Sequence, residues 1–146
     1  MKQKEIFAYT AGIVDGEGSI HIMRSKDVSY KTSLKYELRV SIGNTNEWLC
    51  QWLKMQFGGC VSSHTPLKPH WKRSYNWLMR ANKARDFLEL ILPYLVIKKT
   101  HAELAIKFQN EIQQQKILKN KREDVRIIQE ANYILMKSLN KKGVEI

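Results

Sequence analysis

The first eighteen residues contain a helical pattern with almost no side chains along one face. From about residue 3 to 15 the apolar residues fall at helical spacing, and Ala8, Gly12 and Gly16 recur every fourth position. Small residues on one helix face let two backbones approach closely, so we expect another helix to pack directly against this one. Gly16 and Gly18 then end the helix and release the chain into a strand.

Two acids lie where this helix ends. A helix carries roughly half a negative charge at its C-terminus, so Asp15 and Glu17 destabilise it by about 0.3 to 1 kcal/mol each unless a cation or a donor compensates. We therefore place the chemistry of the chain at this helix end.

From residue 19 the period of the pattern changes to two, which predicts a hairpin of strands at 19–26 and 33–42 around a polar turn at 27–32. One side is apolar and faces inward: Ile20, Ile22, Leu34, Tyr36, Leu38, Val40 and Ile42. The other side is polar and faces outward: His21, Met23, Ser25, Ser33, Lys35, Glu37, Arg39 and Ser41.

The same plan repeats further along the chain. Asn44 or Thr45 is the expected N-cap of a second helix, which Gly58-Gly59 ends. A second hairpin follows, with strands at 60–65 and 71–80. In it Tyr75, Trp77 and Met79 are the expected inward residues, while Ser62, His64, Lys72, Ser74, Asn76 and Arg80 are the outward candidates.

Helical patterns fill the rest of the chain at 83–92, 94–115 and 122–140. In the last of these we expect Val125, Ile128, Ala131, Leu135 and Leu139 to form the apolar side. The sequence thus predicts an α+β fold, with an αββαββα core, one four-stranded antiparallel sheet and C-terminal helices. With 146 residues, the chain 1–146 suits a single domain, with a core at about 6–110 and a helical extension at about 116–142.

Composition excludes several classes of protein. No run of about 18 apolar residues could span a membrane, and the N-terminus lacks the apolar region of a signal peptide, so we expect an intracellular protein without a membrane partner. Cys50 and Cys60 form neither a disulfide framework nor a CxxC pair, and the histidines show no ligand spacing, which argues against structural zinc.

Most of the positive charge lies in one region. Residues 21–85 hold twelve Lys or Arg against three acids, which is +9 of the chain's net +11. A solvated surface would spread its charge, so a basic region interleaved with Trp, Tyr and His favours a polyanionic partner, nucleic acid before membrane.

The segment Thr10–Gly18, with the letters TAGIVDGEG, resembles the signature of the LAGLIDADG homing endonucleases, and Ala11, Gly12, Asp15 and Gly18 are identical to it. The order of elements, Asn44-Thr45, Phe57-Gly58-Gly59, and Leu92-Pro93-Tyr94-Leu95 followed by Lys98 also resemble family landmarks. The resemblance implies a site-specific nuclease that hydrolyses double-stranded DNA. Its divalent metal, Mg²⁺ or Mn²⁺, would be held by Glu17 and the Gly16 carbonyl, with Lys98 beside it.

The sequence has one such motif, whereas cutting both strands needs two sites, so the resemblance implies a homodimer and a pseudo-palindromic target. Its interface would comprise Ala8, Gly12, Asp15 and Gly16, with Asp15 bonding across the dimer. The outward side of the sheet would bind the major groove through His21, Met23, Ser25, Ser33, Lys35, Glu37, Arg39, Ser41, Ser62, His64, Lys72, Ser74, Asn76 and Arg80.

One departure from the family pattern leaves alternatives open. Ile42 falls where the family has a polar residue that supports the water network, and Asn44 or Asn46 could replace it. The second functional hypothesis is a relative that binds without cleaving, either an RNA maturase or a DNA-binding regulator. Members of the family are encoded in bacteria, phages, archaea or organelles, and the sequence does not choose among these.

Overall fold

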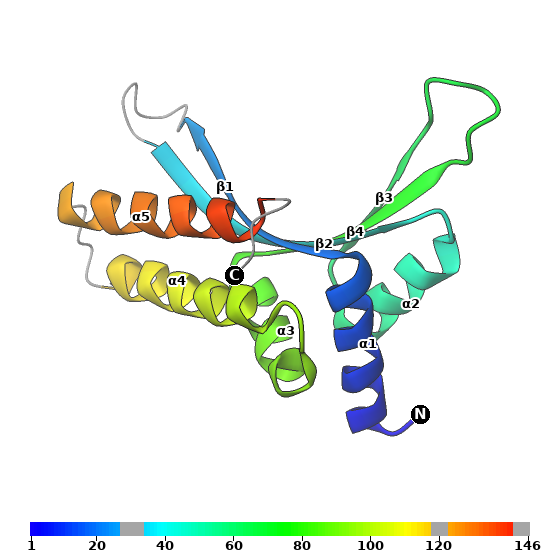
Figure 1. The fold of residues 1–146 in the computed structure, drawn as a ribbon, viewed down its shortest axis with the longest axis horizontal. Helices are drawn as coiled ribbons and strands as arrows, with labels where there is room; N and C mark the ends of the chain where they lie inside the picture. Colours follow the sequence, from blue (N-terminus) through cyan, green and yellow to red (C-terminus); the bar gives the residue numbers. More distant parts are fainter. Residues whose placement is uncertain (27–33, 118–122, 142–146) are drawn as a thin grey trace.

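The computed structural model describes residues 1–26, 34–117 and 123–141, which form four strands and a set of helices around one sheet (Figure 1). The elements in chain order are α1 (Gln3–Glu17), β1 (Gly18–Lys26), β2 (Leu34–Asn44), α2 (Glu47–Phe57), β3 (Cys60–His64), β4 (Ser74–Arg80), α3 (Ala81–Ile91), the 3-10 turn η1 (Leu92–Tyr94), α4 (Lys99–Ile117) and α5 (Glu123–Leu139). The α+β fold with the αββαββα order is confirmed. None of the described helices is long and apolar enough to cross a membrane.

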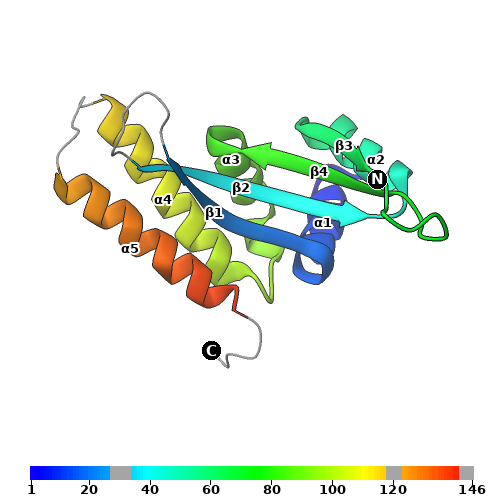
Figure 2. The same ribbon diagram turned by 90° about the horizontal axis from the view of Figure 1, so that it is seen from above.

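The sheet is antiparallel throughout, in the order β1-β2-β4-β3. Its register aligns Ile20 with Val40, and Ile42 with Trp77, and these four side chains have no exposed surface. Because side chains alternate along a strand, this alignment concentrates the apolar residues on one face. The helices cover that face and leave the other uncovered (Figures 1 and 2).

An aromatic cluster joins the sheet to two helices. The Trp77 ring lies 5.0 Å from Phe87 of α3, and Phe87 lies 4.9 Å from Phe57 at the end of α2. The Trp77 indole N–H donates to the Gly58 carbonyl at 2.8 Å, so the buried ring keeps its polar atom satisfied. Gly58 ends α2 with φ +82°, a conformation that favours glycine. Gly59 follows with φ +88°, and a Cβ there would lie 2.8 Å from the Leu78 carbonyl.

Four predicted boundaries were wrong. Gly16 does not end the first helix, because α1 continues to Glu17. The N-cap of α2 is Asn46, not Asn44 or Thr45, because the Asn46 side chain accepts from the Trp48 amide at 3.0 Å. Residues 71–73 lie outside β4, which begins at Ser74 where pairing with His64 starts. The fourth helix begins at Lys99 rather than 94, because η1 and an extended Leu95 come first.

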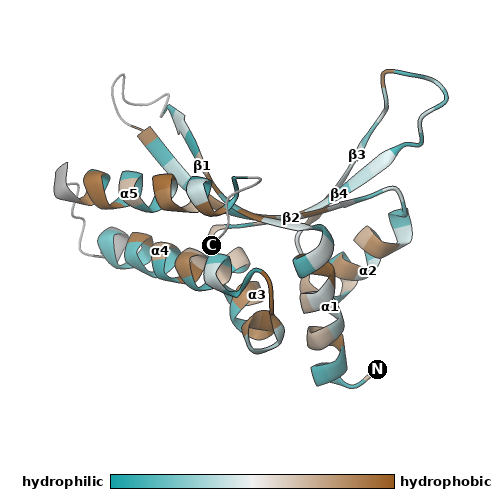
Figure 3. Cartoon of the chain, in the orientation of Figure 1, coloured by the Kyte–Doolittle hydropathy of each residue, from teal (hydrophilic) through white to brown (hydrophobic). Residues whose placement is uncertain are grey.

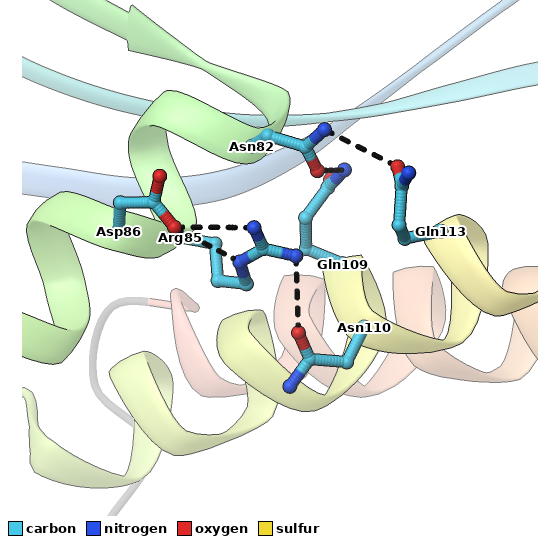
Figure 4. A network of polar contacts seen from close by, with 6 residues as sticks. All are labelled: Asn82, Arg85, Asp86, Gln109, Asn110 and Gln113. Atoms are coloured by element: carbon cyan, nitrogen blue, oxygen red, sulfur yellow. Dashed lines mark hydrogen bonds and ion pairs between the residues drawn. The ribbon is translucent and has the colours of Figure 1, made fainter.

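Polar side chains join α3 to α4 (Figure 4). Gln109, almost fully buried, donates to the Asn82 side-chain oxygen at 2.8 Å, and Asn82 donates to Gln113 at 3.2 Å. Arg85 donates to Asn110 at 3.2 Å. Since a buried amide without partners would be costly, these bonds fix the rotation of α4 against α3.

The last helix docks through polar and aromatic groups. Glu130 of α5 accepts the Tyr36 hydroxyl and forms an ion pair with Arg24, both from the inner face of the first hairpin. The Arg24 guanidinium also lies over the Tyr133 ring, 4.6 Å from its centre. Beside them Met136 is buried.

This docking turns α5 away from the predicted orientation. Ile128, Ala131 and Leu135, expected to face the core, are exposed instead. Asn132 takes a buried position because its amide donates to Glu111 of α4 at 2.9 Å. Hydrophobic spacing could not reveal a buried side built largely from polar bonds.

The cluster around Tyr36 predicts an alkaline transition. Burial and the hydrogen bond to Glu130 raise the pKa of Tyr36 from 10.0 to about 12. The neutral phenol therefore stabilises the folded state fully below pH 10, and this contribution is lost as the pH rises to about 12. The absorbance of tyrosinate at 295 nm is followed against pH for the wild type and for Tyr36→Phe. The difference between the two titration curves should have its midpoint near pH 12. A midpoint near 10 for the difference would contradict the docking of α5.

Candidate functional site

The carboxylate of Asp15 binds the segment that leads into α4. One oxygen accepts the Val96 amide at 2.9 Å, and the other accepts the amides of Ile97 at 3.2 Å and Lys98 at 2.9 Å. The expectation that Asp15 bonds across a dimer is therefore corrected, since its oxygens have partners within the chain. An acid at this place satisfies amides at the start of α4, where negative charge is favourable.

Lys98, directly before α4, in turn binds the end of α1. Its ammonium donates to the carbonyls of Val14 at 2.9 Å, Asp15 at 3.2 Å and Gly18 at 2.6 Å. Burial lowers the pKa of Lys98, and the nearby Asp15 charge opposes this shift. With three backbone acceptors, Lys98 is not a lysine on an open surface. The cation compensates the negative end of the helix.

Gly18 joins α1 to β1 at very short range. A Cβ there would lie 2.8 Å from both the Cα and the carbonyl oxygen of Val14. The backbone conformation itself is ordinary, with φ −82°. Glycine is therefore required by the close approach of strand and helix, and this approach sets where Glu17 stands.

Of the two acids at the end of α1, Glu17 is the exposed one. Among the described residues its side chain receives one hydrogen bond, from the Asn44 side-chain amide to Oε2 at 2.8 Å. The Asn44 oxygen in turn accepts the Asn46 backbone amide at 2.8 Å, which fixes the orientation of the Asn44 side chain. Of the two asparagines considered as replacements at the polar position, Asn44 is the one beside Glu17. Ile42 is fully buried in the sheet.

The donor set around Glu17 suits a hard divalent cation, which prefers carboxylate and carbonyl oxygens. Lys98 binds the carbonyls of Val14, Asp15 and Gly18 but not that of Gly16. Within the described residues no three His, Cys, Asp or Glu side chains gather around one point. The described residues of one chain therefore bring fewer than three such side chains to the end of α1.

No helix among the described residues covers the stripe of small residues on α1. Ala8, Gly12 and Gly16 are all exposed, and a Cβ built at either glycine meets nothing within 4 Å. The chain's own packing therefore does not explain these glycines. The stripe lies on the same helix that ends at Glu17, so a second helix packed here would stand beside this acid.

The uncovered face of the sheet carries most of the predicted outward residues. Pairing aligns His21, Arg39 and Arg80 in one row across three strands, and Ser62 with Asn76, and His64 with Ser74, in others. Met23 pairs with Glu37, and Ser25 with Lys35. Ser33 lies outside the described residues, and Lys72 is exposed in the connection before β4 rather than on a strand.

This face also includes Ser19, Leu78 and Cys60. The predicted residue Ser41 aligns with Ser19 on one side and with Leu78 on the other, and Leu78 aligns with Cys60. In the sequence these residues alternate with Ile20, Val61 and Trp77, and this alternation could have placed them on the uncovered face. Leu78 and Cys60 were not predicted because they are apolar, and Ser19 was not predicted because it lies at the strand start.

Charges on this face are partly arranged by the protein itself. Glu37 accepts from Arg39 at 2.8 Å, two residues along the same strand face. Burial and the neighbouring Arg39 charge lower the pKa of His21, so its ring favours the neutral form. A neutral imidazole offers one donor and one acceptor, which suits hydrogen bonding to base edges.

The Asp15 contacts predict a specific loss of stability. Asp15→Ala leaves three backbone amides without their acceptor, and we expect the free energy of unfolding to fall by about 1 to 2 kcal/mol. Urea denaturation measures it. Asp86→Ala is the matched control, because Asp86 is exposed and pairs only with the adjacent Arg85, and it should change stability by less than about 0.5 kcal/mol. Equal effects of the two changes would contradict the assignment.

Gly18 provides a steric test. Gly18→Ala should lower the free energy of unfolding by about 1 to 3 kcal/mol, since the added methyl meets the backbone of Val14. The control is Gly43→Ala in β2, where the nearest contacts of a Cβ would be ordinary at 3.8 Å. Thermal denaturation of both variants compares them, and a Gly18→Ala protein as stable as Gly43→Ala refutes the close approach.

Comparison with known proteins gave different results for sequence and structure. No protein-family model matches the sequence, and no curated protein matches it. Solved structures do match. The homing endonuclease I-CvuI, solved with a DNA target and Mg, has a TM-score of 0.78 at 18% identity, over 99% of this chain and 88% of its own.

Two further structures agree. The archaeal intron-encoded homing endonuclease I-Vdi141I, complexed with DNA, has a TM-score of 0.79 at 15% identity and covers 99% of this chain and 89% of its own. The LAGLIDADG homing endonuclease I-SmaMI, bound to cleaved DNA, has a TM-score of 0.68 at 18% identity, and the match spans 99% of this chain but 45% of that one. The chain therefore has the fold of the LAGLIDADG homing endonucleases.

Proposed function

We propose that this protein is a site-specific DNA endonuclease that works as a homodimer and hydrolyses one phosphodiester in each strand of a pseudo-palindromic duplex. The observation that carries the proposal is Glu17, an exposed acid at the junction of the bare helix α1 and the uncovered polar sheet. The structural neighbours I-CvuI and I-Vdi141I were both solved with DNA, which supports DNA as the partner.

The dimer is supported by the stripe on α1. Exposed Ala8, Gly12 and Gly16 allow two copies of this helix to approach closely about a two-fold axis. Tyr9, next to the stripe, is also exposed and adds apolar surface. Packing of two copies brings two Glu17 carboxylates together, which supplies the ligands that one chain lacks.

Glu17 and the Gly16 carbonyl would hold the divalent cation, Mg²⁺ or Mn²⁺. Such an ion polarises a phosphodiester and lowers the pKa of a bound water, as required for hydrolysis near neutral pH. The chain's own residues position these ligands. Asn44 orients the Glu17 carboxylate, while Lys98 fixes the last turn of α1 and offsets negative charge there. Among the structural neighbours, I-CvuI was solved with Mg and with Ca.

The uncovered sheet face would read the major groove. Arg39 and Arg80, level with each other in the sheet, are suited to guanine, and Asn76 to adenine, because these side chains can bind two groups on one base edge. Lys35 and Lys72 are suited to phosphates, which hold the protein in register without reading sequence. The local charge of +9 adds a strong dependence of affinity on salt.

The decisive experiment compares cleavage by the wild type and Glu17→Gln. With magnesium and a DNA library of candidate insertion sites, Glu17→Gln should lose cleavage by at least about 100-fold, since changes even behind a ligand cost 10- to 100-fold. Binding to the same DNA should be kept. Glu47→Gln, on the exposed first turn of α2, is the control and should cleave normally.

The outcomes separate the two functional hypotheses. Cleavage by Glu17→Gln at the wild-type rate refutes the site. Binding without cleavage by the wild type favours the relative that binds without cutting, and preference for a structured RNA over DNA would identify a maturase. Affinity that does not change with salt contradicts a nucleic-acid partner altogether.

A further inference from the structure

Buried apolar residues support the hairpin of β1 and β2 along only part of its length. On the inner face of β2, Leu38 has no exposed surface. Two residues nearer the tip, Tyr36 stands level with Arg24 of β1, and beyond this pair Lys26 and Leu34 are exposed. The apolar core therefore ends at the level of Arg24 and Tyr36, and the outer part of the hairpin depends on the contact made there.

One carboxylate of α5 binds both strands at this level. Glu130 accepts the Tyr36 hydroxyl with one oxygen and pairs with the Arg24 guanidinium through the other. The Arg24 guanidinium lies 4.6 Å from the centre of the Tyr133 ring, and the rings of Tyr36 and Tyr133 are 6.1 Å apart. We call these four residues the Glu130 cluster. Because α5 lies alongside the edge strand β1 (Figure 2), the cluster fixes both strands of the hairpin against this helix.

The contact between α5 and the outer hairpin is polar and directional. Hydrophilic and hydrophobic residues alternate along α5 (Figure 3), and those that meet the Arg24 and Tyr36 pair are an acid and a tyrosine. Replacing a buried ion pair by apolar side chains of similar volume often costs no stability. Hydrogen bonds, in contrast, have preferred lengths and angles. The Glu130 cluster is therefore better suited to fixing the direction of the hairpin than to adding stability.

The outward side of this part of the hairpin carries the outermost described pair of the uncovered face. Ser25 stands level with Lys35, directly beyond the Glu130 cluster. The pair of His21 and Arg39 lies four residues nearer Glu17, and its inward neighbours on both strands are buried. A strand rises about 3.3 Å per residue, close to the 3.4 Å per base pair of B-DNA. Along a bound duplex the two pairs would thus lie up to about four base pairs apart.

We propose that Glu130 is a positioning residue for DNA recognition, which sets the direction of the outer hairpin and thereby the sequence specificity at the outer end of each half-site. It lies on the covered side of the sheet and acts through Arg24 and Tyr36. The inference rests on the proposed function, because it takes the uncovered face as the DNA-binding surface. Specificity at the level of Arg39 and Arg80 does not depend on Glu130, since the buried core supports the sheet there.

Binding profiles test the proposal position by position. The wild-type protein selects a duplex from a random DNA library, and affinities are measured for this duplex and for each of its single-base-pair changes. A change at the positions farthest from the centre should weaken wild-type binding at least about fivefold, but binding by Glu130→Ala or Tyr36→Phe less than about twofold. Changes nearer the centre should keep their wild-type effects. The double variant should lose no more specificity than either single variant, because both changes remove the same contact.

Asn132→Ala is the matched control. Asn132 lies on the same helix, two residues after Glu130, but donates to Glu111 of α4 instead of the hairpin. This change should therefore leave the binding profile as it is, even where it lowers the melting temperature. Hydrogen exchange without DNA gives a second readout. In Glu130→Ala the amides of residues 24–26 and 34–36 should exchange at least about tenfold faster, and those of residues 38–40 at the wild-type rate.

The outcomes distinguish this inference from the proposed function. A wild-type protein that selects no duplex refutes DNA recognition, and the role of Glu130 with it. A wild type that selects a duplex, together with a Glu130→Ala profile equal to its own, overturns the positioning role alone. The same holds if the wild type does not discriminate at the outer positions, or if Asn132→Ala weakens outer specificity as much as Glu130→Ala does. Unchanged hydrogen exchange of the outer hairpin in Glu130→Ala would also overturn it.

Discussion

The structure depends on a reciprocal contact between the end of α1 and the start of α4. Asp15 accepts three backbone amides at residues 96–98, and Lys98 donates to three carbonyls around the end of α1. Each charge compensates the backbone groups that the other helix leaves without partners. The contact joins residues that are 80 or more positions apart in the chain and fixes the helix end against the helical layer.

Because of this contact, Asp15 and Glu17 have different roles. Asp15 is used by the fold, and Glu17, two residues later, remains exposed with Asn44 holding one of its oxygens. Gly18 brings the strand so close to Val14 that the chain has little freedom between them. The acid is therefore held on a rigid junction of helix and sheet, a suitable base for a metal ligand whose geometry has to be maintained.

Hydrophobic period and turn residues predicted the order of the elements and the inner faces of β1 and β2, because each depends on neighbours in sequence. The metal-binding role of Glu17, which the family resemblance implies, stays a prediction. The partners of Asp15 and Lys98 could not be predicted from the sequence, since they are backbone groups brought together by the tertiary fold. The predicted orientation of α5 was wrong for a related reason: Glu130 and Asn132 dock the helix by polar bonds, whereas its most hydrophobic side is exposed. Spacing alone cannot distinguish a buried apolar face from an exposed one.

Two features of α1 have no explanation within the described residues of a single copy. The glycines of this helix meet nothing that would require a missing side chain, and the described residues gather no three His, Cys, Asp or Glu side chains around one point. The homodimer proposed above would account for both features together, because a second copy of α1 would cover the glycines and would add a second Glu17. The exposed small residues are thus best understood as a self-complementary surface on the folded unit.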